Sequence, residues 1–181
     1  MTVEHDPRHP LVQQIASEVL RERLAGLPAE LAAPLVGAQL RAKFEAMRAS
    51  RPAATAELLP TGRGDADDAL GYLLVDRSGE ELRLVDLAVR AEARGRGVAS
   101  AALGSLTAEA DAAGRAITLS VWAGDPAERL YARHGFVRIE EAGAREDAAG
   151  GYVELRRPPR PTARQSSVCT GDTSTSSSSA Q

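Results

Sequence analysis

Hydrophobic residues recur every three to four positions along residues 10–50, which is the spacing of one face of an α-helix. The first apolar stripe consists of Leu11, Ile15 and Val19, and the second of Val36, Leu40, Phe44 and Met47. Pro28 and Pro34 lie between the stripes, so we expect them in a turn or at helix starts. The pattern predicts two amphipathic helices whose apolar faces pack against a core.

From residue 53 onward, the apolar positions follow the repeat of β-strands. Strands are predicted at residues 54–59, 70–75, 82–89, 117–122, 136–140 and 152–155. A polar loop at 60–68 and a hairpin turn at 76–79 separate the first three. An alanine-rich helix is predicted from Gly97 to about Gly114, and a short helix from Pro126 to His134. Strands that alternate with helices indicate the α/β class.

The end of the chain has a different composition. Residues 158–181 begin with three prolines and continue mostly as Ser, Thr, Gly and Gln, which cannot bury enough apolar surface to fold. We therefore expect one domain over residues 1–157 and a disordered, serine-rich tail over 158–181. The single cysteine, Cys169, lies in this tail, which excludes an internal disulfide and a cysteine-rich metal site.

Overall charge and hydropathy narrow the function classes. The net charge of −3 gives no reason to expect a nucleic-acid partner. No apolar run approaches the roughly 20 residues that span a bilayer, and the first residues lack the order of a signal peptide. We therefore expect a cytoplasmic protein with no membrane partner. Of the three histidines, His5 and His9 lie at the start of the chain and only His134 lies among the predicted strands, so no metal site is predicted.

The segment Arg94-Gly95-Arg96-Gly97-Val98-Ala99 lies between a predicted strand and the alanine-rich helix. Such a turn aims consecutive backbone N–H groups and a helix N-terminus at one point, which suits a phosphate. Glycines 95 and 97 allow close approach of a ligand, and the arginines can donate charge-assisted hydrogen bonds. The turn therefore predicts a site for a phosphate-bearing ligand.

Two motifs together resemble the GCN5-related N-acetyltransferases (GNAT). Arg94, Gly97 and Ala99 match motif A of that family, Arg/Gln-x-x-Gly-x-Gly/Ala, and residues 127–136 (AERLYARHGF) look like its motif B. The resemblance covers about residues 53–156. It implies a mixed, mostly antiparallel, twisted sheet with helices on both faces, in which strands 82–89 and 117–122 are parallel. The family's first strand then falls either near Thr2-Val3 or at 54–59.

The resemblance implies an acetyl-CoA-dependent N-acetyltransferase that transfers acetyl directly to an amine. The backbone of Arg94 to Ala99 would hold the pyrophosphate, helped by the hydroxyl of Ser100. Leu87, Ala88 and Val89 would pair with the pantetheine arm, and an N–H there would polarise the thioester carbonyl. Tyr131 would act as general acid on the leaving sulfur.

The base is less constrained. Asp86 is the best candidate because burial in a central strand would raise its pKa, although its alternation with Leu82 and Leu84 also allows it to point away. Glu57 and Glu81 are alternatives. Gly124 stands where the family often has Asn, and the adjacent Asp125 is expected to cap the short helix.

Other residues receive structural interpretations. His134 is expected to close the short helix as a cation, Trp122 to pack in the core, and the arginines of 156–160 to be solvated. Helices 10–50 would wall the acceptor site, with Gln39, Glu45 and Arg48 as lining candidates. The acceptor itself stays open between a small amine, an amino acid, and a peptide N-terminus or lysine, and family resemblance allows a homodimer.

Two rival functions remain at this point. The first is a non-catalytic acyl-CoA-binding module, which Gly124 favours and Tyr131 opposes. The second is a dinucleotide-binding oxidoreductase, since glycine turns also hold pyrophosphate. That fold needs Gly-x-Gly-x-x-Gly after a first strand, whereas Ser100 stands at the third glycine.

Overall fold

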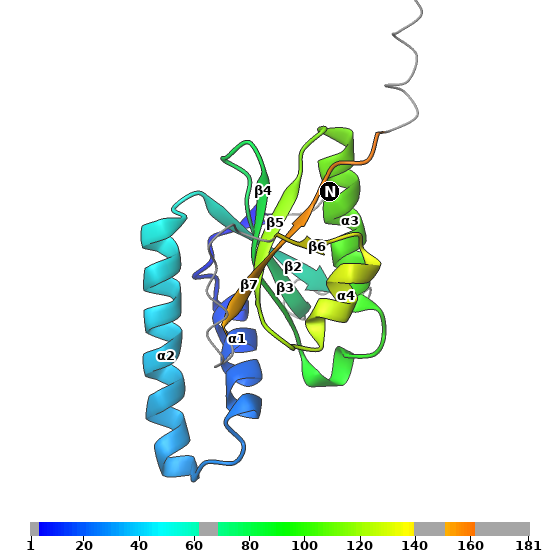
Figure 1. Ribbon diagram of the computed structural model, residues 1–181. Helices are drawn as coiled ribbons and strands as arrows, with labels where there is room; N and C mark the ends of the chain where they lie inside the picture. The colour runs from blue at the N-terminus through cyan, green and yellow to red at the C-terminus, as the bar shows by residue number, and fades with distance from the viewer. Residues whose placement is uncertain (1–3, 62–68, 140–150, 162–181) are drawn as a thin grey trace, which may run out of the picture.

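The computed structural model describes residues 4–61, 69–139 and 151–161. A seven-stranded sheet runs in the order β1-β2-β3-β4-β5-β7-β6. Helices α1 and α2 lie on one side of the sheet and α3 and α4 on the other (Figure 1). The predicted α/β fold, with a mixed and mostly antiparallel sheet, is confirmed.

The strands are β1 (Glu4–His5), β2 (Ala54–Pro60), β3 (Ala69–Asp76), β4 (Leu82–Val89), β5 (Ile117–Trp122), β6 (Val137–Arg138) and β7 (Tyr152–Arg157). The α-helices are α1 (Pro10–Arg23), α2 (Ala29–Ser50), α3 (Val98–Ala112) and α4 (Ala127–Arg133), and a 3-10 turn spans Ala91–Ala93. Predicted elements that fall on 62–68, on 140 or on 162–181, including most of the tail, lie outside the described residues, as does Thr2-Val3.

The N-terminal elements decide one expectation and correct another. A short first strand, β1, precedes the helices and pairs with β2, so of the two predicted positions for the family's first strand the one near Thr2-Val3 is confirmed and the one at 54–59 is wrong. Pro28 caps α2 as expected, but Pro34 lies inside that helix rather than at a start or turn. A proline at this position removes the hydrogen bond that its N–H would have donated to the carbonyl of Glu30, and its ring crowds that carbonyl.

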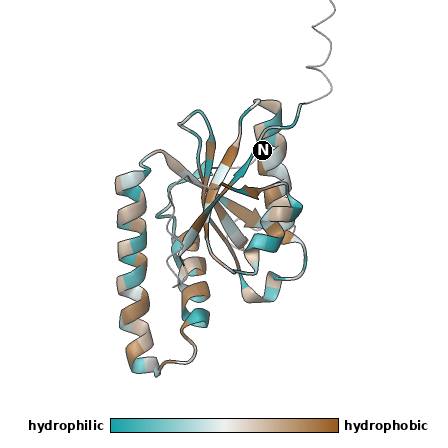
Figure 2. Ribbon diagram, in the orientation of Figure 1, coloured by the Kyte–Doolittle hydropathy of each residue, from teal (hydrophilic) through white to brown (hydrophobic). Residues whose placement is uncertain are grey.

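Two apolar clusters hold the layers together, one on each face of the sheet. The larger one packs Leu84 and Leu119 of the sheet against Leu103 and Leu106 of α3. The other packs the sheet against α1 and α2, with Phe44 at its centre. Figure 2 shows hydrophobic residues concentrated on the strands, while hydrophilic and hydrophobic residues alternate along α1 and α2. This matches the amphipathic stripes of residues 10–50.

The sheet splits in its middle. Strands β4 and β5 are parallel, as predicted, but they pair only at Leu82↔Ile117 and Arg83↔Thr118. On its other edge, β5 pairs with β7 along its whole length. Residues 84–89 of β4 therefore have a strand neighbour on the β3 side alone. This one parallel pair among the described strands also excludes the parallel sheet that a dinucleotide-binding oxidoreductase requires.

Candidate functional site

The free edge of β4 exposes backbone groups inside the sheet. Arg90 N–H donates to Leu70 C=O, which fixes the alternation of the β3–β4 ladder. The backbone of Ala88 consequently points to β3, whereas the N–H and C=O of Leu87 and Val89 point to the side that β5 has left. An open cavity of about 480 Å³, which we name the edge cavity, lies there. It is lined by Leu87, Ala88, Val89, Arg94, Ala99, Leu130 and Tyr131, and by residues of α1.

The glycine-arginine turn reaches the edge cavity through Arg94 and Ala99, whereas Arg96, Gly97 and Val98 line a separate cavity beside β2 and α3. Gly95 and Gly97 adopt φ of 72° and 81°, a left-handed conformation that side chains rarely adopt. Gly97 directly precedes Val98, where α3 begins, so the first-turn N–H groups of Val98, Ala99 and Ser100 have no partner within the helix. Like any helix start, these groups suit an anion.

The two arginines of the turn have different roles. The Arg94 guanidinium makes two hydrogen bonds of 2.6 Å to Glu22 of α1 and donates through Nε to the carbonyl of Val89 at 3.2 Å. It therefore ties the turn to α1 and occupies one backbone acceptor of the free edge. Arg96 is exposed and has no side-chain partner among the described residues.

Tyr131 projects from α4 into the edge cavity. Its ring packs edge-to-face on Phe136 at 5.7 Å between centroids, and its side chain is almost fully buried. Burial, with the negative charges of Asp86 and Asp125, raises the pKa of Tyr131 to about 12. Within the described part of the chain the hydroxyl has no hydrogen-bond partner, so a protonated phenol is available to a ligand in the cavity.

A bulge in β4 decides where Asp86 points. Asp86 pairs with Leu74 and Leu84 pairs with Val75, so Val85 is an extra residue in β4. Leu84 packs on the α3 side, whereas Val85 packs on the α1/α2 side. The bulge therefore turns Asp86 to the α1/α2 face, away from Leu84, which simple alternation from Leu82 and Leu84 could not predict.

On that face Asp86 lines a second cavity of about 350 Å³ between the sheet and the two N-terminal helices, which we name the helix cavity. Its Oδ2 accepts from Lys43 Nζ at 2.6 Å and from the Tyr72 hydroxyl at 2.5 Å. In the described part of the structure no hydrogen bond reaches Oδ1. Burial, followed by the charge of Asp86, raises the pKa of Tyr72 well above its usual value, so Tyr72 stays a donor.

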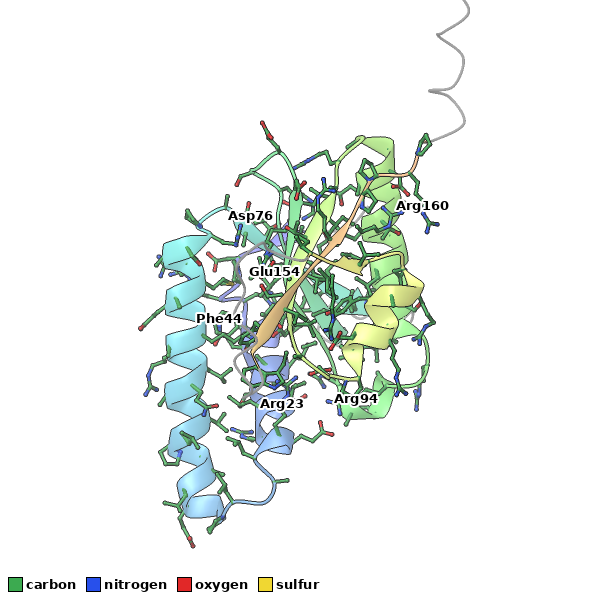
Figure 3. The ribbon with its side chains drawn as sticks, viewed as in Figure 1. Arg23, Phe44, Asp76, Arg94, Glu154 and Arg160 are labelled. Carbon is green, nitrogen blue, oxygen red and sulfur yellow. The ribbon has the colours of Figure 1, made fainter. Side chains whose placement is uncertain are left out.

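The two cavities adjoin across β4. Val19, Arg23, Leu87 and Ala88 line both of them. Gln39 lines the helix cavity as expected, whereas Glu45 and Arg48 line neither cavity. Arg23 and Lys43 were not singled out from the sequence. Arg23 is the last residue of the first helix, and Lys43 lies beside the apolar stripe of the second, but neither belongs to a motif. Figure 3 shows Arg23 at the same end of the molecule as Arg94.

Comparison with known proteins decides the family. A family model described as "Acetyltransferase (GNAT) domain" matches residues 40–149. This chain belongs to the GNAT family of acetyltransferases. No sequence among the curated proteins matches it. None of the described helices is long and apolar enough to cross a membrane, and no group of potential metal ligands gathers among the described residues.

Solved structures agree with this GNAT assignment. A Corynebacterium glutamicum structure, described as histone acetyltransferase HPA2 and related acetyltransferase, aligns with a TM-score of 0.59 at 21% identity over 90% of this chain and 98% of that one. An aminoglycoside 6'-N-acetyltransferase in complex with coenzyme A aligns at 0.56, with 16% identity over 90% and 99%. A GNAT-family structure from Desulfovibrio desulfuricans aligns at 0.55, with 15% identity over 87% and 99%. These likenesses show a shared GNAT fold.

The second GNAT motif keeps its local geometry without the family's Asn. Gly124 has a φ of 83° and no side chain, and its N–H donates to Glu128 Oε1 at 2.6 Å. Asp125 Oδ1 accepts from Ala127 N–H, the first N–H of α4, at 2.8 Å, although the N-cap residue is Pro126 and not Asp125 as expected. The loop that contains Gly124 and Asp125 is therefore fixed by hydrogen bonds to residues of α4.

Ser100 and His134 connect the two GNAT motifs. Ser100 Oγ lies 2.8 Å from His134 Nε2. His134 does close α4, but burial and the charges of Arg133 and Arg157 lower its pKa, so a neutral ring is favoured over the expected cation. This pair fixes the start of α3 relative to the end of α4.

Three other expectations meet different structures. Trp122 is half exposed and stacks edge-on with Tyr152 at 5.2 Å, so the core assignment is wrong. By alternation it falls on the face of the sheet opposite Val121, which packs in the α3-side core. Arg157 is buried and forms a bidentate pair with Asp111, at 2.8 and 2.7 Å, rather than being solvated. The alternative bases pair with arginines outside both cavities, Glu57 with Arg77 and Glu81 with Arg156.

Proposed function

We propose that this protein is an acetyl-CoA-dependent N-acetyltransferase in which an amine attacks the thioester directly, with no acyl-enzyme intermediate. The observation that carries the proposal is the split between β4 and β5. It leaves a free strand edge inside the sheet that ends at a glycine turn and a helix start. An extended ligand with a phosphate at one end complements this arrangement, and coenzyme A has that form.

The cofactor would lie along the edge cavity. The N–H groups from Gly95 through Arg96 and Gly97 to Val98, Ala99 and Ser100 would hold the pyrophosphate, whereas the N–H of Arg94 already donates to the carbonyl of Ala91. The edge of Leu87, Ala88 and Val89 would pair with the pantetheine arm as a missing strand would. An N–H of this edge would also polarise the thioester carbonyl and stabilise the oxyanion of the tetrahedral intermediate.

The amine would reach the thioester from the helix cavity. Its nitrogen bonds to the carbonyl carbon, the carbon–sulfur bond breaks, and the ammonium proton passes to Asp86. Oδ1 is the oxygen of Asp86 suited to this role, because Lys43 and Tyr72 both donate to Oδ2. With a pKa of about 12, Tyr131 stabilises the departing thiolate chiefly through a hydrogen bond, since a thiol is the stronger acid.

A second candidate is a GNAT module that binds acyl-CoA without transfer. The Lys43 ammonium on Asp86 favours it, because it competes with the acceptor for the same carboxylate. The two functions share cofactor binding and differ in turnover.

Calorimetry with acetyl-CoA and with NADPH, followed by CoA release in the presence of amines, tests the proposal. We expect acetyl-CoA alone to bind. Tyr131→Phe keeps the ring contact with Phe136, so acetyl-CoA affinity should hold while kcat falls about 100-fold. The phenol stays protonated below its pKa of about 12, so wild-type kcat should show no alkaline loss from this group between pH 7 and about 10. Failure to bind acetyl-CoA would refute the proposal, and binding without turnover of any amine would favour the non-catalytic module.

A further inference from the structure

At the junction of the edge and helix cavities stands an arginine, Arg23, whose guanidinium makes no hydrogen bond or ion pair in the described structure, although its charge is attracted to the carboxylate of Glu22. Arg23 lines both cavities. The neighbouring carboxylates of α1 are occupied, since Glu22 binds Arg94 at 2.6 Å and Glu18 lies 3.4 Å from Arg90. Among the described residues no acceptor or carboxylate pairs with the Arg23 guanidinium. A planar cation that is free in this way is suited to a bidentate carboxylate.

The helix cavity has the wrong charge for a polycation. Arg23 and Lys43 both line it, and its one carboxylate, Asp86, is already paired with Lys43 at 2.6 Å. A polyamine or aminoglycoside would bring further positive charges against these two cations, which is unfavourable. A substrate with its own carboxylate would instead balance Arg23.

The position of Arg23 also sets where that carboxylate lies on the substrate. Leu87, whose backbone would face the thioester, lines the same junction as Arg23. The attacking nitrogen and the carboxylate must therefore be close together on the substrate, as they are across one carbon in an α-amino acid. A peptide N-terminus has a neutral amide in place of the carboxylate. A protein lysine has neither a carboxylate nor an amide on the carbon that bears its amine.

The size of the helix cavity agrees with a small acceptor. Its volume of about 350 Å³ lies near the lower end of the roughly 300–1,000 Å³ typical of small-molecule sites. We propose that the acceptor is a free α-amino acid whose carboxylate is bound by Arg23 while its amine attacks acetyl-CoA. This inference rests on the proposed N-acetyltransferase function.

The test compares two substrate pools on three proteins. The pools are an equimolar mixture of the nineteen L-amino acids other than cysteine, which carries a thiol of its own, and the matching mixture of their α-carboxamides, and CoA thiol release is the readout. The proteins are wild type, Arg23→Gln and Arg21→Gln. Arg21 is an exposed arginine in the same helix that lines neither cavity, so its variant is the matched control. Acetyl-CoA affinity is measured for each protein by calorimetry.

We expect the wild type to acetylate the acid pool and to prefer it over the amide pool by about 10- to 100-fold, the size of a charged hydrogen-bonded contact. Arg23→Gln should remove that preference by lowering the rate with the acid pool at subsaturating concentration, and should keep acetyl-CoA affinity within about threefold. Arg21→Gln should behave as wild type.

Equal rates with both pools, transfer to other amines but not to the acid pool, or an equal loss in Arg21→Gln would overturn the inference and leave N-acetyltransferase function standing. A loss of acetyl-CoA binding in Arg23→Gln would also overturn it, because Arg23 would then serve the cofactor. A wild type that does not bind acetyl-CoA would instead remove the proposed function on which the inference rests.

Discussion

Gly97→Asp separates the phosphate-binding role of the turn from its backbone geometry. Gly97 precedes α3 with a φ of 81°, and a Cβ there would meet no atom within 4 Å. An aspartate side chain therefore fits sterically, at a backbone cost of about 1–2 kcal/mol for the left-handed conformation. Its carboxylate would stand at the helix start where we place the pyrophosphate.

Coulomb's law gives the size of the expected binding defect. A carboxylate about 5 Å from one phosphate charge, at an effective dielectric constant of about 20, costs about 3 kcal/mol. This corresponds to a loss of roughly 200-fold in acetyl-CoA affinity. Gly97→Ala carries the backbone strain without the charge, so its affinity should fall by less than about tenfold.

Gly114→Asp is the control at the other end of the same helix. Gly114 has a φ of 64° and equally open space around its Cβ position, so both aspartate variants should lose about 1–2 kcal/mol in urea unfolding. Calorimetry should then show weak acetyl-CoA binding for Gly97→Asp alone. Affinity within threefold of wild type in Gly97→Asp, or an equal loss in Gly114→Asp, would refute a phosphate at this turn.

Two stability predictions follow from contacts outside the site. Asp111→Asn leaves the buried Arg157 guanidinium without its carboxylate, so the free energy of unfolding in urea should fall by about 3 kcal/mol. Arg157 lowers the pKa of Asp111 below 3.8, so the difference in free energy of unfolding between the variant and wild type should be full above that pH and shrink as pH falls below it. A loss under 1 kcal/mol at pH 7 would contradict this account. Gly71→Ala would place a Cβ against the carbonyl oxygen of Ala88 and should lower stability by about 2 kcal/mol, whereas Gly104→Ala, in open helix, should raise it by about 0.5–1 kcal/mol. Equal effects of the two alanines in thermal melts would show that the strand contact does not matter.

Hydropathy patterns located the elements well because each has a strong local signal. The strand predicted at 117–122 and the helix ending near Gly114 agree with the structure, since period and glycine chemistry are properties of short segments. The first strand could be placed only as one of two alternatives, because Glu4–His5 is too short to show a period. Pairing with β2, a contact distant in sequence, is what makes it a strand.

The candidate site depends on features that no local pattern shows. The direction of Asp86 follows from the bulge at Val85, which breaks the two-residue alternation. Arg157 faces the core in phase with Leu155, and only the position of Asp111 on α3 explains why a charge is stable there. Arg23 is a candidate substrate-binding residue only because two cavities meet beside it, and no sequence pattern shows those cavities.

The split sheet gives β4 two kinds of amide within one strand. The N–H of Ala88 lies in the ladder with Tyr72, while those of Leu87 and Val89 face the edge cavity. Hydrogen exchange should therefore alternate residue by residue in the free protein, slow at Ala88 and fast on either side of it. A ligand that fills the edge would make exchange uniform, so the coenzyme would act as the eighth strand of an otherwise incomplete sheet, and part of the fold's rigidity would come from its substrate.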